Sequence, residues 1–166
     1  MKKIIRQFTL VLTISLGFAV SSCTDDSSNP TTSGSNGSMT CKINGSSWTG
    51  KGSTFNNSLN IDMTSGNHLI IDGKDENDTR IVLTANGDKP GTYVLDVPNS
   101  KFDAGASLQI MDNGQRVIAT TTDVTITITS LDQSSQKASG SFRFVSDDNK
   151  YDVTSGTFKD LHFEIK

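Results

Sequence analysis

Residues 123–131 read Asp-Val-Thr-Ile-Thr-Ile-Thr-Ser-Leu, and this stretch decides the fold class of the chain. Its apolar residues alternate with threonine at a period of two, and β-branched side chains stand on both faces. A period of two is typical of a β-strand, and β-branched residues fit a pleated sheet well. The stretch therefore predicts a long strand with one buried face and one wet face.

Shorter stretches on either side repeat this pattern. Strand-like runs lie at residues 41–43, 69–71, 80–84, 92–95, 108–111, 116–120, 141–145 and 161–166. The turn-forming sequences between the runs are Asn44-Gly45, Asp72-Gly73, Asn86-Gly87, Asn113-Gly114 and Asp147-Asp148-Asn149. Asn-Gly and Asp-Gly pairs adopt the positive φ angles that tight hairpins need. The sequence predicts an all-β body of about ten short strands, either an antiparallel β-sandwich or a barrel-like meander.

The first 22 residues have a different composition from the rest. Basic residues at positions 2, 3 and 6 precede a short apolar segment at 8–20, and small residues follow it. A positive start, a short apolar segment and small residues at the end describe a secretory signal peptide. The apolar segment is too short and too rich in hydroxyl groups for a permanent membrane span. We therefore expect residues 1–22 to be cleaved from the mature chain.

The residues at the expected cleavage site, Val20-Ser21-Ser22-Cys23, resemble the lipobox of bacterial lipoproteins. The resemblance implies that lipid is attached to the Cys23 sulfur and that this covalent lipid holds the chain to a membrane. Two or three acyl chains anchor a protein stably, because each buried methylene contributes about 0.8 kcal/mol. An ordinary signal peptide with an incidental cysteine is the alternative.

A polar segment, residues 23–38, follows the cleavage site and contains no large apolar side chain. Such a composition cannot form a core, and we expect a flexible tether with an average span of roughly 20 Å. Asp25-Asp26 resembles the acidic signals that send some Bacteroidetes lipoproteins to the cell surface, with two solvated aspartates as the alternative. We expect a lipid-anchored protein of the cell envelope, in the outer membrane, with its exposure at the cell surface left open. Residues 39–166 then form a single all-β domain.

Charge and cysteine content argue against a nucleic-acid-binding protein and against a disulfide-stabilised protein. The chain has 15 basic and 18 acidic side chains, and the leader holds three of the basic ones, so the mature chain has a net charge of −6. This sign argues against nucleic-acid binding, because phosphates need Lys or Arg. The cysteines are Cys23 and Cys41, so a lipidated Cys23 leaves Cys41 without a disulfide partner in the chain. We expect Cys41 to be a small buried strand residue.

Turn glycines and aromatic residues occur in an order that resembles a known group of proteins. The motifs are the stretch from Cys41 to Trp48, Gly91-Thr92-Tyr93, Gly140-Ser141-Phe142-Arg143-Phe144 and Gly156-Thr157-Phe158. Together they resemble a family of small uncharacterised Bacteroidetes lipoproteins, over residues 39–166. Because no activity is established for that family, the resemblance implies a fold and no catalytic residue.

One polar cluster is a candidate calcium site. Asp72, Asp75 and Asp78 lie close together in the sequence, and oxygen ligands at this density suit Ca²⁺, which takes six to eight of them. The spacing differs from that of an EF-hand loop, and Lys74 lies among the acids. A solvated hairpin tip is therefore the favoured interpretation, and no other metal or cofactor is expected.

Three aromatic residues are candidates for contact with a ligand. Trp48, Tyr93 and Tyr151 are of the types that stack on sugar rings in many carbohydrate-binding β-sandwiches. The chain has a single tryptophan and few large apolar residues, so a domain of this size needs its aromatic residues inside. A core position is therefore the favoured interpretation for Trp48.

Signals for catalysis are weak. The sequence has no G-x-S-x-G motif, and His68 and His162 each stand beside an alternating run, which favours a position on a wet face or a rim. We expect no enzyme, with an Asp-based hydrolase as the alternative. The expected function is that of an envelope lipoprotein whose non-catalytic β domain binds a protein or a glycan. A purely structural or accessory lipoprotein is the other alternative, and the oligomeric state stays open.

Overall fold

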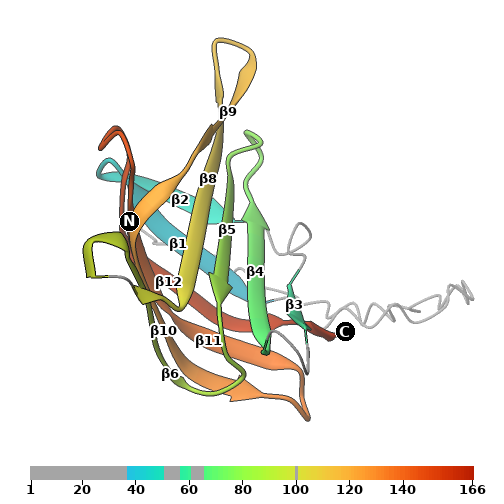
Figure 1. Ribbon diagram of the computed structural model, residues 1–166. Coiled ribbons are helices and arrows are strands. Elements are labelled where there is room, and N and C mark those ends of the chain that lie inside the picture. Colours follow the sequence, from blue (N-terminus) through green and yellow to red (C-terminus); the bar gives the residue numbers. More distant parts are fainter. Residues whose placement is uncertain (1–36, 51–56, 61–65, 100) are drawn as a thin grey trace, which may run out of the picture. The chain divides into compact units, whose positions relative to one another are not determined.

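Two β-sheets packed face to face form the domain (Figure 1). The structure is a computed structural model that describes residues 37–50, 57–60, 66–99 and 101–166. Cys23 and the expected leader lie outside these residues. Within them, the single helical element is a 3₁₀ turn, η2, at Val97–Asn99. No helix among the described residues is long and apolar enough to cross a membrane.

The first sheet has seven strands in the order β2-β1-β12-β11-β10-β6-β7. Its strands are β1 (Ser38–Ile43), β2 (Ser46–Gly50), β6 (Gly91–Asp96), β7 (Lys101–Phe102), β10 (Thr121–Asp132), β11 (Lys137–Ser146) and β12 (Asp152–His162). All its neighbouring strands are antiparallel. The pairing of β1 with β12 joins the two ends of the domain, with Met39 opposite Phe158.

The second sheet has six strands in the order β13-β3-β4-β5-β8-β9. Its strands are β3 (Ser58–Asn60), β4 (His68–Lys74), β5 (Arg80–Ala85), β8 (Ala104–Asp112), β9 (Gln115–Ala119) and β13 (Glu164–Ile165). Its neighbours are antiparallel except β13, which pairs in parallel with β3. The predicted all-β class is therefore confirmed, as a sandwich of 13 strands rather than about ten.

The stretch that predicted the fold class lies in β10, the longest strand. Val124, Ile126 and Ile128 are buried, whereas the threonines between them are half-buried. This strand has ladders on both sides, with β11 and with β6, which is the place in a sheet where alternating β-branched residues pack best.

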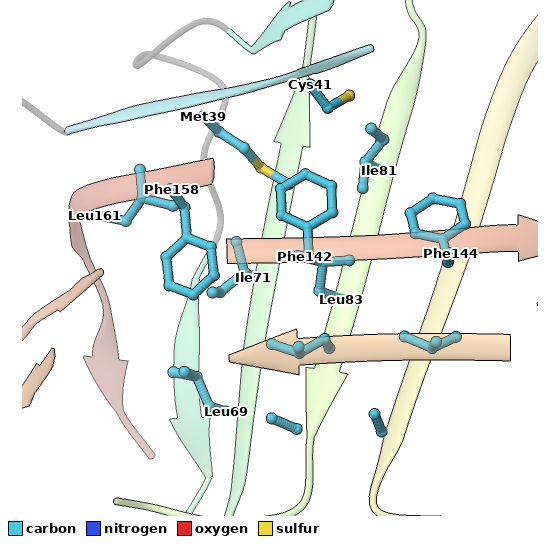
Figure 2. Close-up of a cluster of buried hydrophobic side chains, with 14 of the residues drawn as sticks. Met39, Cys41, Leu69, Ile71, Ile81, Leu83, Phe142, Phe144, Phe158 and Leu161 are labelled. Carbon is cyan, nitrogen blue, oxygen red and sulfur yellow. The ribbon is translucent and has the colours of Figure 1, made fainter. Parts of the chain in front are cut away.

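The core lies between the inner faces of the two sheets (Figure 2). Phe142, Phe144 and Phe158 from β11 and β12 meet Leu69, Ile71, Ile81 and Leu83 from β4 and β5. Burial of a side chain of this size contributes about 1.5–3 kcal/mol. Gly156 allows the close approach of β11 and β12, because a Cβ there would lie 2.6 Å from Cδ2 of Phe142.

Two predicted Asn-Gly turns are confirmed. Asn44-Gly45 joins β1 to β2 with φ angles of 50° and 81°, and Asn113-Gly114 joins β8 to β9 with φ angles of 49° and 77°. The turn predicted at Asp72-Gly73 is wrong, because both residues lie inside β4. Asp72 is held there by non-local partners: its N–H donates to Oδ1 of Asn57, and its carboxylate binds Arg80.

The chain passes from the second sheet to the first between β9 and β10. The chain leaves β9 of the second sheet at Ala119 and enters β10 of the first sheet at Thr121. Thr121 marks the change, because its Oγ1 donates to the carbonyl of Ala106 in β8 while its backbone is already paired with Ser146 in β11. The β8–β9 hairpin therefore lies directly before the point where the chain leaves the second sheet. In Figure 1 the hairpin extends beyond the ends of β4 and β5.

Candidate functional site

Trp48 lies in the core, as the favoured interpretation predicted. It stands in β2 opposite Cys41 of β1, and its side chain is only 5% exposed. Its indole Nε1 is buried and has no hydrogen-bond partner. Because stacking on a sugar requires an open ring face, this tryptophan cannot serve as a stacking platform in this conformation.

The two tyrosines lie apart from each other and from Trp48 in the strand order. Tyr93, in β6, is half-buried, and its hydroxyl donates to the carbonyl of Lys89 at 2.8 Å. Tyr151, directly before β12, is 8% exposed, and Nζ of Lys150 lies 5.2 Å from its ring centroid. The structure therefore gives each tyrosine a local partner and does not gather the three candidate aromatic residues on one surface.

The acidic candidates are engaged by groups of the chain itself. Asp72 forms a salt bridge with Arg80, and Asp78 forms one with Lys74. Asp75 caps the actual turn of this hairpin, since its Oδ1 accepts the N–H groups of Asn77 and Thr79. Among the described residues no group of His, Cys, Asp or Glu forms a cluster that could hold a metal ion. The three aspartates of the candidate calcium site are therefore spread over β4 and the β4–β5 turn.

A cavity of about 300 Å³ brings together two features that the sequence analysis treated separately. Ser47, Trp48 and Thr49 of β2 form one side, and Asp75, Glu76 and Asn77 of the β4–β5 turn form the other. Residues with hydroxyl, carboxylate and carboxamide side chains thus line a small space beside Trp48. No pattern in the sequence predicts this arrangement, because β2 and the turn belong to different sheets.

Cys41 and the histidines occupy structural positions. Cys41 lies in β1 and is buried, and burial raises the pKa of its thiol to about 12. Its thiolate is therefore scarce at neutral pH, which agrees with the predicted role as a buried strand residue. Nδ1 of His68 lies 3.0 Å from Oδ1 of Asn86, and His162 is exposed at the end of β12.

The β8–β9 hairpin is apolar on both faces. Residues paired across an antiparallel ladder share a face, so Ile110 and Val117 lie on the inner face, and Met111 and Ile118 lie on the outer face. Met111 is 46% exposed and Ile118 is 57% exposed. A signal was present in the sequence: two consecutive apolar residues on each side of an Asn-Gly turn must give a hairpin with two apolar faces.

A groove of about 160 Å³ begins where β9 ends. Its walls are Ile118, Ala119 and Thr120 on one side and Asp147 and Asp148 of the β11–β12 turn on the other. Oγ1 of Thr120 donates to Oδ2 of Asp147, and the hydroxyl of Ser146 donates to Oδ1 of Asp148. This hydrogen bond from Ser146 is the main reason why the pKa of Asp148 lies below its usual range. The carboxylate of Asp148 is therefore charged at neutral pH.

The open edge of β9 lies beside this groove. β9 is the last strand of the six-stranded sheet and pairs with β8 alone among the described strands. The other outer strands of the two sheets are shorter or of similar length, and β7 and β13 have only two residues each. The exposed edge, the apolar side chains and the acidic groove together form the surface that we call the β9 edge (Arg116–Thr120, Asp147 and Asp148).

Comparison with known proteins gives one match. A family model described as a domain of unknown function, DUF6252, matches residues 35–162. No curated protein and no solved structure matches the chain. The expected resemblance to a family without an assigned activity is thus confirmed, and the match carries no activity over to this chain.

Proposed function

We propose, from the premise that the chain belongs to the DUF6252 family, that it is a lipid-anchored bacterial envelope protein whose domain binds a protein partner without catalysis. The leader, the Val20-Ser21-Ser22-Cys23 sequence and the polar tether support the anchor. The fold supports the binding role, since a sandwich presents its sheet edges and hairpins to partners.

The observation that carries the binding role is the exposure of Ile118 and Met111 on a hairpin that extends from the sheets (Figure 1). Large apolar side chains are seldom left exposed together on a monomer, and where they gather they mark an interaction site. The open backbone edge of β9 adds hydrogen-bonding groups to the same surface. An apolar surface with a free strand edge suits a protein partner better than a sugar.

A second candidate function is the binding of a saccharide unit in the cavity beside Trp48. The observation that favours it is the convergence of Ser47, Thr49, Asp75 and Asn77 around a space of about 300 Å³. Polar groups of these types donate to and accept from sugar hydroxyls. Recognition there would depend on hydrogen bonds alone, because the Trp48 ring is shielded.

The test separates the anchor from the binding surface. The full chain is expressed in an envelope-containing bacterial host, and a Cys23→Ala variant is compared with it after detergent-free washing of membranes. We expect the wild type to stay with the membrane and the variant to be released. If Cys23→Ala still fractionates with membranes, the lipid anchor is wrong.

The binding surface is tested in the same host with a photo-crosslinking amino acid at position 118. A matched control carries the same amino acid at Thr129, an exposed position of β10 away from the hairpin. We expect a protein adduct at 118 and none at 129. Equal labelling at both positions would remove the hairpin as the binding surface, and a saccharide that competes for the cavity would favour the second candidate.

A further inference from the structure

The direction of the backbone groups on β9 follows from the turn that precedes it. Asn113-Gly114 is a two-residue turn, and Asp112 and Gln115 form the pair that closes it. In such a hairpin the closing pair is hydrogen-bonded, and alternate residues then point toward or away from the partner strand. Gln115, Val117 and Ala119 therefore bond to β8, and the residues between them direct their N–H and C=O groups outward.

An observed hydrogen bond confirms this direction. The carbonyl of Thr120, the next residue in the outward series, accepts the N–H of Asp147 in the β11–β12 turn at 3.0 Å. Arg116 and Ile118 belong to the same series. Their backbone groups offer two donors and two acceptors along an edge that no described strand covers. Thr120 and Asp147 close that edge at its carboxyl end.

The charge at the closed end is negative. Asp147 uses Oδ2 for Thr120, and Asp148 uses Oδ1 for Ser146 and for the N–H of Lys150. None of these hydrogen bonds uses Oδ1 of Asp147 or Oδ2 of Asp148, and the charge of Lys150 also acts on the carboxylate of Asp148. A side chain that enters the groove past Ile118 thus meets a hydrophobic wall first and two carboxylates beyond it.

A second copy of this chain does not fit this edge well. An antiparallel pair of β9 strands centred on Val117 would bring the Asn113-Gly114 turn of one copy against Thr120 of the other. The N–H of Asp147 already occupies the carbonyl of Thr120 there. In addition, each mature chain carries a net charge of −6, so two copies repel one another.

We propose that β9 accepts, by antiparallel strand addition, an extended segment of a partner protein that begins with a Lys or Arg residue. Antiparallel pairing matches the rest of this edge and places the amino end of the segment at the carboxyl end of β9. The basic side chain then lies in the groove between Ile118 and the carboxylates of Asp147 and Asp148. The next outer-face residue of the segment is apolar and packs on Ile118. The inference rests on the proposed function and names the kind of partner.

The probe is a synthetic eight-residue peptide of alternating valine and threonine with one lysine near its amino end. Two matched peptides carry the lysine near the carboxyl end or a glutamate near the amino end. Binding to the full mature chain is measured by fluorescence anisotropy at low salt. We expect the first peptide to bind at least about threefold tighter than the second and about tenfold tighter than the third, as charge pairs of this kind allow.

Variants then test the edge itself. Ile118→Pro removes one outward N–H and leaves the β8–β9 ladder intact, so it should weaken binding about tenfold while the protein stays folded. Ile118→Thr keeps the N–H and removes the apolar wall, and it should weaken binding less. Asp147→Asn with Asp148→Asn should abolish the preference for lysine near the amino end. Melting temperatures of all variants show whether a loss of binding is a loss of folding.

Two outcomes overturn the inference. The first is that Ile118→Pro binds the peptide as the wild type does, or that the lysine position makes no difference. The second is a dimer of the wild-type chain in sedimentation that Ile118→Pro dissociates, which would assign the edge to a second copy. The first result leaves the Cys23→Ala fractionation and the crosslink at 118 unaffected, so the proposed function stands or fails separately. A dimer would be recognised at 118 as an adduct between two copies of the chain.

Discussion

The two hairpins that end in Asn-Gly turns have nearly the same local geometry and very different surroundings. Asn44-Gly45 and Asn113-Gly114 differ by only a few degrees in φ. The side chain of Asn44, however, joins the body: its Nδ2 donates to the carbonyl of Lys150, and its Oδ1 accepts the N–H of Asp152. No described hydrogen bond of this kind holds the side chain of Asn113. The neighbouring Asp112 makes an exposed 3.8 Å salt bridge with Lys150, and the hairpin extends outward (Figure 1).

The Asn-Gly dipeptide therefore determines the conformation of the turn but not how the hairpin packs against the rest of the domain. In the β1–β2 hairpin, β1 also pairs with β12 on its other side. The core-facing residues of this hairpin, Cys41 and Trp48, are buried. At the equivalent positions of the β8–β9 hairpin, Ile110 and Val117 are only half-buried. We call the β1–β2 hairpin the anchored hairpin, and we call the β8–β9 hairpin, on which Met111 and Ile118 are exposed, the free hairpin.

The largest effect expected from this comparison is on core packing. Ile126→Ala in β10 removes a side chain that is 1% exposed, and it should lower the free energy of unfolding by about 2–5 kcal/mol. Ile118→Ala makes the same change on the free hairpin and should change it by less than about 0.5 kcal/mol. Chemical denaturation of the two variants measures the difference. Similar losses for both would mean that the hairpin is packed in solution.

The turn side chains give the next largest effect. Asn44→Gly keeps the positive φ angle and removes two hydrogen bonds to the β11–β12 turn, so it should cost about 1–3 kcal/mol. Asn113→Gly makes the same backbone change without those bonds and serves as the control. Chemical denaturation measures the loss of unfolding free energy in each variant, and the loss should be larger for Asn44→Gly than for Asn113→Gly. No difference would show that water replaces the Asn44 bonds at no cost.

The thiol of Cys41, on the anchored hairpin, makes the stability of the fold depend on pH. Burial raises its pKa in the fold from the ordinary value of 9.0 to about 12, so the neutral thiol stabilises the fold below pH 9. This stabilisation is lost as the pH rises toward 12. The loss amounts to about 1.4 kcal/mol for each pH unit above 9. Cys41→Ser should flatten the alkaline part of the stability profile.

A reactivity measurement sharpens the same point. In a chain without Cys23, native Cys41 should resist a thiol reagent at pH 8, whereas a cysteine at the equivalent position of the free hairpin, Ile110→Cys in a Cys41→Ser background, should react much faster. Equal slow rates would indicate that the second hairpin is covered in solution.

The smallest effect concerns a third turn, which has no Asn-Gly pair. Asp132 organises the β10–β11 turn, and hydrogen bonds from the hydroxyls and N–H groups of Ser134 and Ser135 hold its pKa below the usual range. A lowered pKa stabilises the fold at neutral pH, and this stabilisation is lost as the pH falls below about 4. Asp132→Asn should therefore lower the thermal midpoint slightly at pH 7, and the difference from the wild type should shrink as the pH falls below about 4.

Much of the fold could be predicted from local signals, and the candidate surface could not. The alternation in residues 123–131 and the Asn-Gly turns at 44–45 and 113–114 identified strands and hairpins, because these depend on neighbours in the sequence. The turn predicted at Asn86-Gly87 is wrong as a hairpin, because β5 and β6 on either side of it belong to different sheets. Asp72-Gly73 failed because Asp72 binds Arg80 and Asn57 across strands. The β9 edge escaped prediction for a similar reason: Asp147 and Asp148 meet Ile118 only after the chain has crossed from one sheet to the other.

The pairing of β1 with β12 has a consequence for the order in which the domain forms. A chain is synthesised from its amino end, and residues 38–43 must wait for residues 153–159 before their ladder can close. Contacts so distant in sequence slow folding, because the intervening chain has to be ordered first. Until the last strands emerge, the growing chain has no complete first sheet. A domain whose first and last long strands pair can therefore complete its first sheet only after residues 153–159 have been synthesised.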